Sequence, residues 1–175
     1  MNKQREGIKP QDVLVLSKII AIQNEVFKQL DLALELGISQ AEIAHSLNRL
    51  KRAGLLNENK KKLNKLAVIE FFKHVLKFLF PVELEGSARG ISIGPSADFI
   101  KRKVRNDDFG IVVEDIDGKD KGVAVVPIYK TVAKAIKNDE KLYKIICLVD
   151  IFRGLGSVRH RQVAEAEFNK IILGK

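Results

Sequence analysis

Apolar residues recur at helical spacing near the start of the chain and predict two short helices. Pro10 suits the first turn of a helix, and the apolar positions after it predict a helix over residues 10–23. A second run of 3.6-residue periodicity predicts a helix over residues 28–36. Gly37 follows at once and supplies the permissive backbone at which helices end.

A third helix is predicted from Ser39 to the residue before Gly54. Its first residues, Ser39-Gln40-Ala41-Glu42, match a capping box, in which the Ser39 hydroxyl accepts from the amide of Glu42 and the Glu42 carboxylate accepts from the amide of Ser39. One face of this helix carries apolar side chains, namely Ile43, Leu47 and Leu50. The other side is polar and includes one histidine and two arginines, namely His45, Arg49 and Arg52.

The next segment predicts two very short strands and then a long apolar helix. Leu55-Leu56 and Leu63 flank the polar run 57–62, which is typical of two strands joined by a basic turn. Residues 65–80 are apolar around most of a helix circumference, and Pro81 ends the pattern. Such a helix needs cover on two sides, from a partner subunit or from the rest of the chain.

The second half of the chain is less regular at first and then helical. Glycine and proline punctuate residues 81–110, which predicts a linker or a long surface loop. Two β-rich stretches around Asp117-Gly118 predict a hairpin within residues 111–128. Amphipathic patterns then predict helices over 131–138, 139–153 and 157–173.

These elements predict a mainly α protein with a small β wing. We expect an N-terminal winged helix-turn-helix with its connecting helix over residues 8–80, a linker or surface loop over 81–110, and a C-terminal, mostly helical domain over 111–175. The length of 175 residues allows one ordinary domain or two small ones.

The charge balance favours a polyanionic partner. Lys plus Arg number 31 against 22 Asp plus Glu, which gives a formal net charge of +9, and most of the excess lies in the first 80 residues. A computed pI near 9.6 is typical of proteins that bind nucleic acid, with an anionic membrane surface as the second candidate.

Compartment and membrane character follow from three observations. Charged residues interrupt the long apolar runs, namely Lys18 in the first and Lys73 and Lys77 in the second, so no run reaches the ~20 residues of a membrane span. Met1 is followed by polar residues, and no apolar signal segment follows them. Cys147 is the single cysteine and cannot form an internal disulfide. We expect a soluble cytoplasmic protein.

The spacing of helix, short turn and helix over residues 28–53 is that of a DNA-binding helix-turn-helix. Ala33 is expected at the close crossing of the two helices, Gly37 in the turn, and Ile38 and Ile43 in the angle between them. Four residues at fixed offsets favour this motif over the alternative, an ordinary small helical core.

The segment LDLALELGISQAEIAHSLNRLKRAGLL, followed by the basic turn 57–62 as a wing, resembles the winged helix-turn-helix of MarR-type regulators. Further segments are similar, in the same order, to a bacterial family of MarR-type or helix-turn-helix transcriptional regulators: GIKPQDVLVL, EFFKHVLKFLFP, SARGISIGPSA, VPIYKTV and LYKIICLVDIFRG. Ala88 departs from a Thr-Arg-Gly-like stretch in the third of these. The resemblance implies DNA binding in transcriptional control.

Positions on the third helix assign the contacts to duplex DNA. The residues expected to meet base edges project opposite the apolar face, namely Gln40, Ala41, His45 and Asn48. Gln suits adenine and Ala suits the thymine methyl group. The residues expected to contact phosphates are Ser39, Arg49, Arg52, Lys60, Lys61 and Lys62. The alternative for each is a solvated helix face.

The sequence gives little support for a catalytic site, so we expect that the protein is not an enzyme and binds no cofactor or metal. Cys147 lies in an apolar run that is typical of inert core thiols. Asp115, Asp117 and Asp120 resemble a calcium loop, but Val126 stands where the closing Glu belongs. His74 lies beside Glu70 and is interpreted as structural.

Two questions about partners stay open at this level. A winged helix reads one half-site, and the apolar helix 65–80 needs cover, so a homodimer is predicted; the alternative is that the helices 139–153 and 157–173 cover it within a monomer. The alternative function is an adaptor or antitoxin-like subunit, whose C-terminal domain binds a partner protein while DNA binding serves autoregulation.

Overall fold

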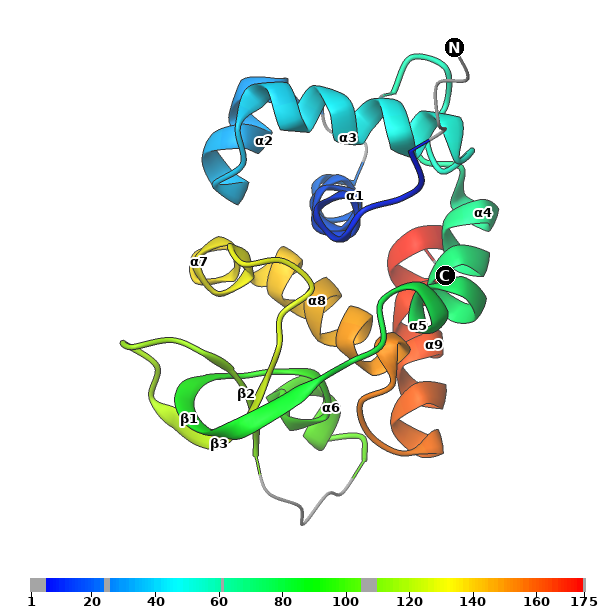
Figure 1. Ribbon diagram of the computed structural model, residues 1–175. Coiled ribbons are helices and arrows are strands. Elements are labelled where there is room, and N and C mark those ends of the chain that lie inside the picture. Colours follow the sequence, from blue (N-terminus) through cyan, green and yellow to red (C-terminus); the bar gives the residue numbers. More distant parts are fainter. Residues whose placement is uncertain (1–5, 24–25, 61, 105–109, 175) are drawn as a thin grey trace.

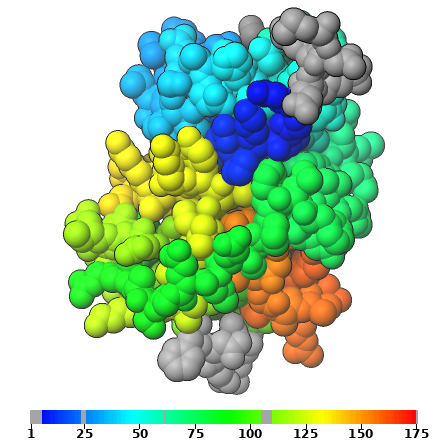
Figure 2. All heavy atoms as spheres, in the orientation of Figure 1, coloured from blue at the N-terminus to red at the C-terminus, as the bar shows by residue number. Residues whose placement is uncertain are grey.

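The computed structural model describes residues 6–23, 26–60, 62–104 and 110–174 and shows a mainly helical protein with a small three-stranded sheet (Figure 1). The N-terminal helices lie at one end of the molecule and the sheet at the other, with α8 between them. The fold class is therefore mainly α with a small β component. On the face shown in the space-filling view, the atoms of the N-terminal helices and those of the sheet belong to one continuous surface (Figure 2).

Three helices form the N-terminal end: α1 (Pro10–Ile22), α2 (Gln29–Leu36) and α3 (Gln40–Arg52). Their bounds confirm the helices that the apolar periodicity predicts. Gly37 ends α2 in the left-handed region, with φ of 63°, a conformation that costs a residue without a Cβ little. Ten consecutive residues of α1, 12–21, are buried, so this helix lies inside the molecule on all its sides.

The predicted helix 65–80 is present but not uniform. It consists of α4 (Lys65–Glu70), a π-helical turn (Phe71–Val75) and α5 (Leu76–Leu79). Ahead of it, Leu56 and Leu63 form an isolated antiparallel bridge, which replaces the two short strands expected there. The widened turn accommodates Phe71 and Phe72 side by side in the core.

The expected linker over 81–110 is wrong for much of its length. Residues 84–92 form the strand β1 (Leu84–Ser92), followed by a 3-10 turn (Gly94–Ser96) and α6 (Asp98–Lys101). One of the glycines that suggested an irregular segment, Gly90, has a packing role in this strand. A Cβ on Gly90 would lie 2.0 Å from the carbonyl oxygen of Val113, so the close approach of the two strands requires glycine.

The hairpin expected within 111–128 is also wrong. Strands β2 (Ile111–Glu114) and β3 (Asp120–Val125) run parallel to each other, and each pairs antiparallel with β1. Each strand thus pairs with the other two, so the three strands close into a small barrel, and Gly90 of β1 pairs with both Glu114 and Asp120. The Asp117-Gly118 turn is present, but it does not join two antiparallel strands. The antiparallel partner of both β2 and β3 is the long strand β1.

The C-terminal helices are α7 (Val132–Ile136), α8 (Glu140–Arg153) and α9 (Val158–Leu173), close to the predicted ranges. Helices α8 and α9 cover the inner side of the helix of residues 65–79 within the same chain. The ring of Phe72 lies 4.9 Å from that of Phe168 in α9 and 6.4 Å from that of Phe152 in α8, between centroids. One alternative for covering this helix, the chain's own C-terminal helices, is thus observed.

One hydrophobic core runs through the described residues from α1 to α9. Helix α1 packs on α3 on one side and on α8 on the other. Lys18 of α1 bonds to Glu35 of α2 and, at 2.6 Å, to Asp139 ahead of α8. The expected boundaries at residues 80 and 110 therefore do not separate two cores. In the described part of the chain, no helix combines the length and apolarity that crossing a bilayer needs.

Candidate nucleic-acid interface

The outward side of α3 is an exposed face whose side chains make no hydrogen bond or ion pair with other described residues. It contains all four residues predicted to meet base edges, namely Gln40, Ala41, His45 and Asn48, and also Arg52. Ala41, His45, Asn48 and Arg52 follow one another at spacings of three or four residues, so they form one row along the helix. The structure brings these predicted residues together.

The opposite side of α3 is fixed to the core, and the turn before it explains its direction. Ala33, Ile38 and Ile43 are buried, as the predicted helix crossing requires. The amide of Ile38 donates to the carbonyl oxygen of Ala33 at 3.1 Å, which closes the turn around Gly37. This arrangement leaves the first turn of α3 exposed.

Ser39 caps that first turn. Its hydroxyl accepts a hydrogen bond from the amide of Glu42 at 3.2 Å, as predicted. The second half of the predicted capping box is wrong, because the Glu42 carboxylate turns away from Ser39. It accepts from the side chains of Arg49 at 2.5 Å and Gln11 at 3.1 Å instead.

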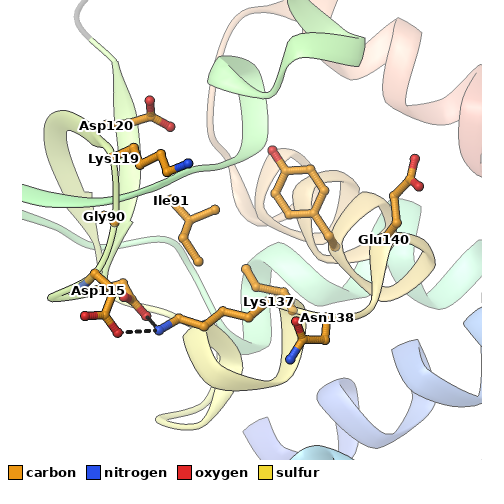
Figure 3. Close-up of a pocket in the computed structure, with 12 residues that line it drawn as sticks. Gly90, Ile91, Asp115, Lys119, Asp120, Lys137, Asn138 and Glu140 are labelled. Atoms are coloured by element: carbon orange, nitrogen blue, oxygen red, sulfur yellow. Dashed lines mark hydrogen bonds and ion pairs between the residues drawn. The ribbon is translucent and has the colours of Figure 1, made fainter.

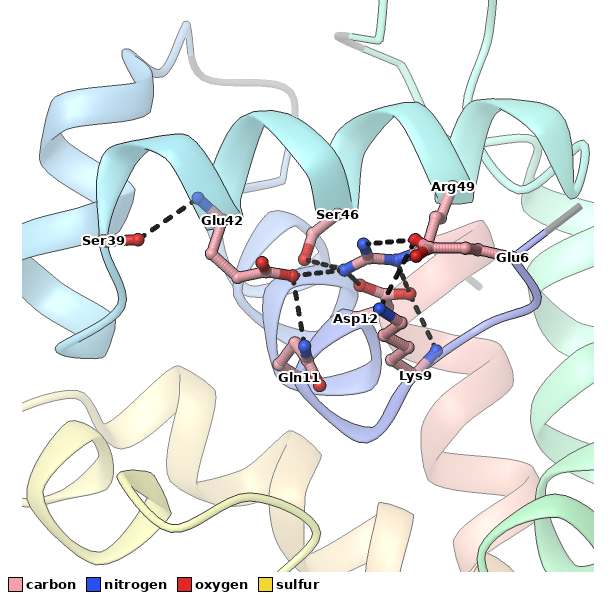
Figure 4. Close-up of polar contacts among 8 residues, drawn as sticks. All are labelled: Glu6, Lys9, Gln11, Asp12, Ser39, Glu42, Ser46 and Arg49. Carbon is pink, nitrogen blue, oxygen red and sulfur yellow. Dashed lines mark hydrogen bonds and ion pairs between the residues drawn. The ribbon is translucent and has the colours of Figure 1, made fainter. Parts of the chain in front are cut away.

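The prediction that Arg49 contacts phosphate is wrong, because its side chain is 3% exposed. Its guanidinium points from α3 toward α1 and donates to the carboxylate of Asp12 (Figure 4). It also donates to Glu42 and to the hydroxyl of Ser46. The hydrogen bonds to Asp12 raise the pKa of Arg49 above its ordinary value, so the group stays charged. The hydrogen bond from Arg49 lowers the pKa of Glu42.

Sequence reasoning missed this ion cluster and therefore the role of Asp12, which is completely buried. One signal was available. Asp12 stands directly before the apolar run 13–16, and an acidic residue inside an otherwise buried helix needs a cation or several donors.

A basic turn follows α3 and projects from the same end of the molecule. The amide of Lys62 donates to the side chain of Asn57 at 3.1 Å, and the amide of Asn57 donates to the carbonyl of Lys62. The side chains of Lys60 and Lys62 form no ion pair with another described residue, whereas Lys51 pairs with Glu58 at 2.5 Å. Lys61, the third predicted phosphate contact of this turn, lies outside the described residues.

A separate hollow of about 800 Å³ lies between the sheet and the α7–α8 connection (Figure 3). Lys137 stands at its edge and pairs with Asp115 at 2.8 Å and Asp117 at 3.2 Å. The hydrogen bond from Lys137 lowers the pKa of Asp115. Tyr143 lines the hollow and donates to the carbonyl of Ser92 at 2.7 Å. The volume of this hollow is within the range of small-molecule binding sites.

Other chemically active groups are held in the core or on a helix surface. Cys147 is completely buried, which raises the pKa of its thiol, and an uncharged thiol is a poor nucleophile. His74 lies 3.6 Å from Glu70 on an exposed helix side. Over the ranges that the structure describes, no group of three or more His, Cys, Asp and Glu side chains has the arrangement of a metal site.

Comparisons with models of protein families, with curated proteins and with solved structures give no match for this chain. The resemblance to MarR-type regulators therefore stays a prediction.

Proposed function

We propose that this protein binds double-stranded DNA through the outward face of α3 and acts as a transcriptional regulator. The observation that carries the proposal is the outward face of α3, where Gln40, Ala41, His45 and Asn48 are exposed and make no polar contact with other described residues. A helix of this kind, held by its opposite face and following a short turn, fits the major groove of B-DNA.

The charges around α3 support this proposal. Arg52 on the helix and Lys60 and Lys62 on the basic turn form no ion pair with another described residue. The basic turn takes the place of the wing in a winged helix-turn-helix. These cations are placed to contact the phosphates on either side of a groove while α3 contacts the base edges. Ser39, at the N-terminus of α3, adds a hydroxyl beside the exposed first turn.

In this proposal two copies act together. One α3 helix reads only one half-site, and a two-fold homodimer would place two such helices about 34–36 Å apart, which is one turn of DNA. The adaptor or antitoxin-like role remains the alternative. It predicts a stable complex with a partner protein, made through the C-terminal region.

The test is a titration with duplex DNA at several salt concentrations, after selection of a preferred site from random duplexes. The protein should bind, and the logarithm of its affinity should fall linearly with the logarithm of salt concentration because phosphate contacts release counterions. Lys62→Ala should reduce that slope by about one unit. Lys141→Ala, an exposed lysine on α8, serves as the matched control and should leave the slope unchanged.

Three outcomes would contradict the proposal: no binding at low salt, binding that does not depend on salt, or binding that is the same for the protein and for a Gln40→Ala, Asn48→Ala double variant. The last outcome would place any DNA contact away from α3.

A further inference from the structure

The outer side of residues 65–79 is a second exposed face. Unlike the polar outward face of α3, it carries large apolar side chains. Leu66 in α4 is 70% exposed and Phe78 in α5 is 74% exposed, although both are large apolar side chains. Between them lie Glu70 and His74, whose side chains are 70% and 60% exposed. We call these four residues the outer stripe.

The π-helical turn keeps the outer stripe on one side. Its members are spaced by four residues, and in a regular α-helix each such step advances about 40° beyond a full turn. Three steps would carry Phe78 well around the helix from Leu66. The turn Phe71–Val75 has wider i to i+5 bonding and rotates less per residue, which offsets that drift. All four side chains are exposed as a result.

The order of the stripe is self-complementary. Leu66 and Phe78 lie equally far from residue 72, and so do Glu70 and His74. Phe72 itself is buried on the inner side, so the two-fold axis passes the outer face midway between Glu70 and His74. A second copy of this segment, placed antiparallel about that axis, sets Leu66 against the partner's Phe78 and Glu70 against the partner's His74. Each contact then occurs twice, as a two-fold interface requires. A parallel pairing would set Glu70 against the same residue of the partner.

We propose that the outer stripe is a homodimer interface, in which the segment 65–79 of two copies packs antiparallel about residue 72. The occupant of the exposed face is therefore a second copy of this chain. One helix face is smaller than the roughly 800 Å² that each partner buries in a stable complex. We therefore expect dissociation in the micromolar range, and self-association needs no DNA.

This interface also fits the proposed DNA binding. Only the placement of the two α3 helices on DNA depends on that proposed function; the homodimer itself does not. The segment of 65–79 is about 22 Å long at the rise of an α-helix. An antiparallel pair places the two basic turns, which precede Lys65, at opposite ends of the pair. The two α3 helices then lie apart on the dimer, as two half-sites require.

Charge exchange between copies provides the first test, by sedimentation of the full chain at 1–100 μM, an interval that spans the expected dissociation about tenfold either way. His74→Glu sets Glu against Glu70 of the partner, and Glu70→Lys sets Lys against the partner's His74, so each variant alone should self-associate at least tenfold more weakly. An equimolar mixture of the two should recover association, because it creates a Lys and Glu pair across the interface. Mixing leaves the contact between residues 70 and 74 within each chain unchanged, so recovery reports only contacts between copies.

Cysteine crosslinking provides the second test and fixes the register. Leu66→Cys mixed with Phe78→Cys should form a disulfide-linked dimer under mild oxidation. Either variant alone should not, because equivalent positions lie about 18 Å apart along the pair, beyond the ~7 Å limit between the Cα atoms of a disulfide. Cys147 is completely buried, so the unmodified protein is the background control.

A monomer at 100 μM, at the weak end of the expected range, would overturn the proposed interface, as would a dimer that is insensitive to all four substitutions or a disulfide formed by Leu66→Cys alone. A complex with another protein on this face, in a chain that stays monomeric by itself, would equally overturn it. None of these results bears on whether α3 binds DNA, because the salt titration can be done on a single half-site with the monomer.

Discussion

Arg49 of α3 and Asp12 of α1 form a two-point ion pair, in which Nε donates to Oδ2 at 2.8 Å and Nη2 donates to Oδ1 at 2.7 Å. Both side chains are buried. A planar guanidinium and a carboxylate joined in this way allow little rotation about the contact. The pair therefore fixes the orientation of α3 on α1, and with it the direction of the exposed row that we propose reads DNA.

Removing one member of this pair should be strongly destabilising. Asp12→Ala leaves the Arg49 charge buried with less compensation, so we expect the free energy of unfolding to fall by about 3–5 kcal/mol. Urea unfolding followed by circular dichroism measures this. The double variant Asp12→Leu, Arg49→Met removes both charges and should recover most of the loss, whereas Arg52→Met at the exposed face should stay within about 0.5 kcal/mol. Equal losses for Asp12→Ala and Arg52→Met would mean that the pair contributes nothing special.

The contacts of α3 should separate specificity from general affinity. Gln40→Ala or His45→Ala should cost about 1–3 kcal/mol on the preferred DNA site and leave binding to unrelated DNA nearly unchanged, since base edges differ between the two. Lys62→Ala should weaken binding to both alike. Fluorescence anisotropy with both duplexes measures the two losses. If Gln40→Ala lowers both affinities equally, Gln40 does not read bases.

A pH effect is expected from Asp150 of α8. Burial raises the pKa of this carboxyl group from its ordinary 3.8 to about 6, while Arg153 at 2.7 Å opposes the increase. Because the pKa is higher in the folded state, the stability that Asp150 contributes is fully present below pH ~4 and is lost as pH rises through about 6. The free energy of unfolding of the protein minus that of Asp150→Asn should therefore become lower, in the signed sense, as the pH rises from 4 to 6.5. A difference that is constant over this interval would contradict the prediction.

The strand β1 offers a matched pair of glycines. A Cβ on Gly90 would lie 2.0 Å from the Val113 carbonyl oxygen, and backbone cannot move aside as a side chain can. Gly90→Ala should cost about 3 kcal/mol, at the upper end for overpacking. A Cβ on Gly86 in the same strand meets nothing within 4 Å, so Gly86→Ala should leave the midpoint of thermal unfolding unchanged or slightly higher. Similar effects of the two substitutions would count against the close strand approach.

The helices could be predicted because their signals are local. Pro10, Gly37 and Ser39 mark starts and ends within one turn of the residues they affect, and the apolar spacing supplies the rest. The sheet could not, because its pairing depends on residues far apart along the chain. Gly90 makes the approach to Val113 possible, yet in the sequence it looks like another loop glycine.

The candidate site divides in the same way. Exposure of Gln40 and His45 follows from the helix period, which places them away from Ile43 and Leu47. The burial of Arg49 does not, because its partner Asp12 belongs to another helix. An arginine near the end of a helix has the same local sequence whether it faces phosphate or a buried carboxylate.

The burial of α1 on every side has a consequence for synthesis of the chain. Helix α1 leaves the ribosome before α8, which covers one of its sides and follows about 120 residues later. At ~5–20 residues per second, that interval is about 6–24 s. Throughout it, a helix with ten consecutive buried residues in the folded protein has no permanent cover on that side. A nascent chain arrested before α8 should therefore bind chaperones through α1 and be cut there by proteases, and both should cease once α8 has emerged.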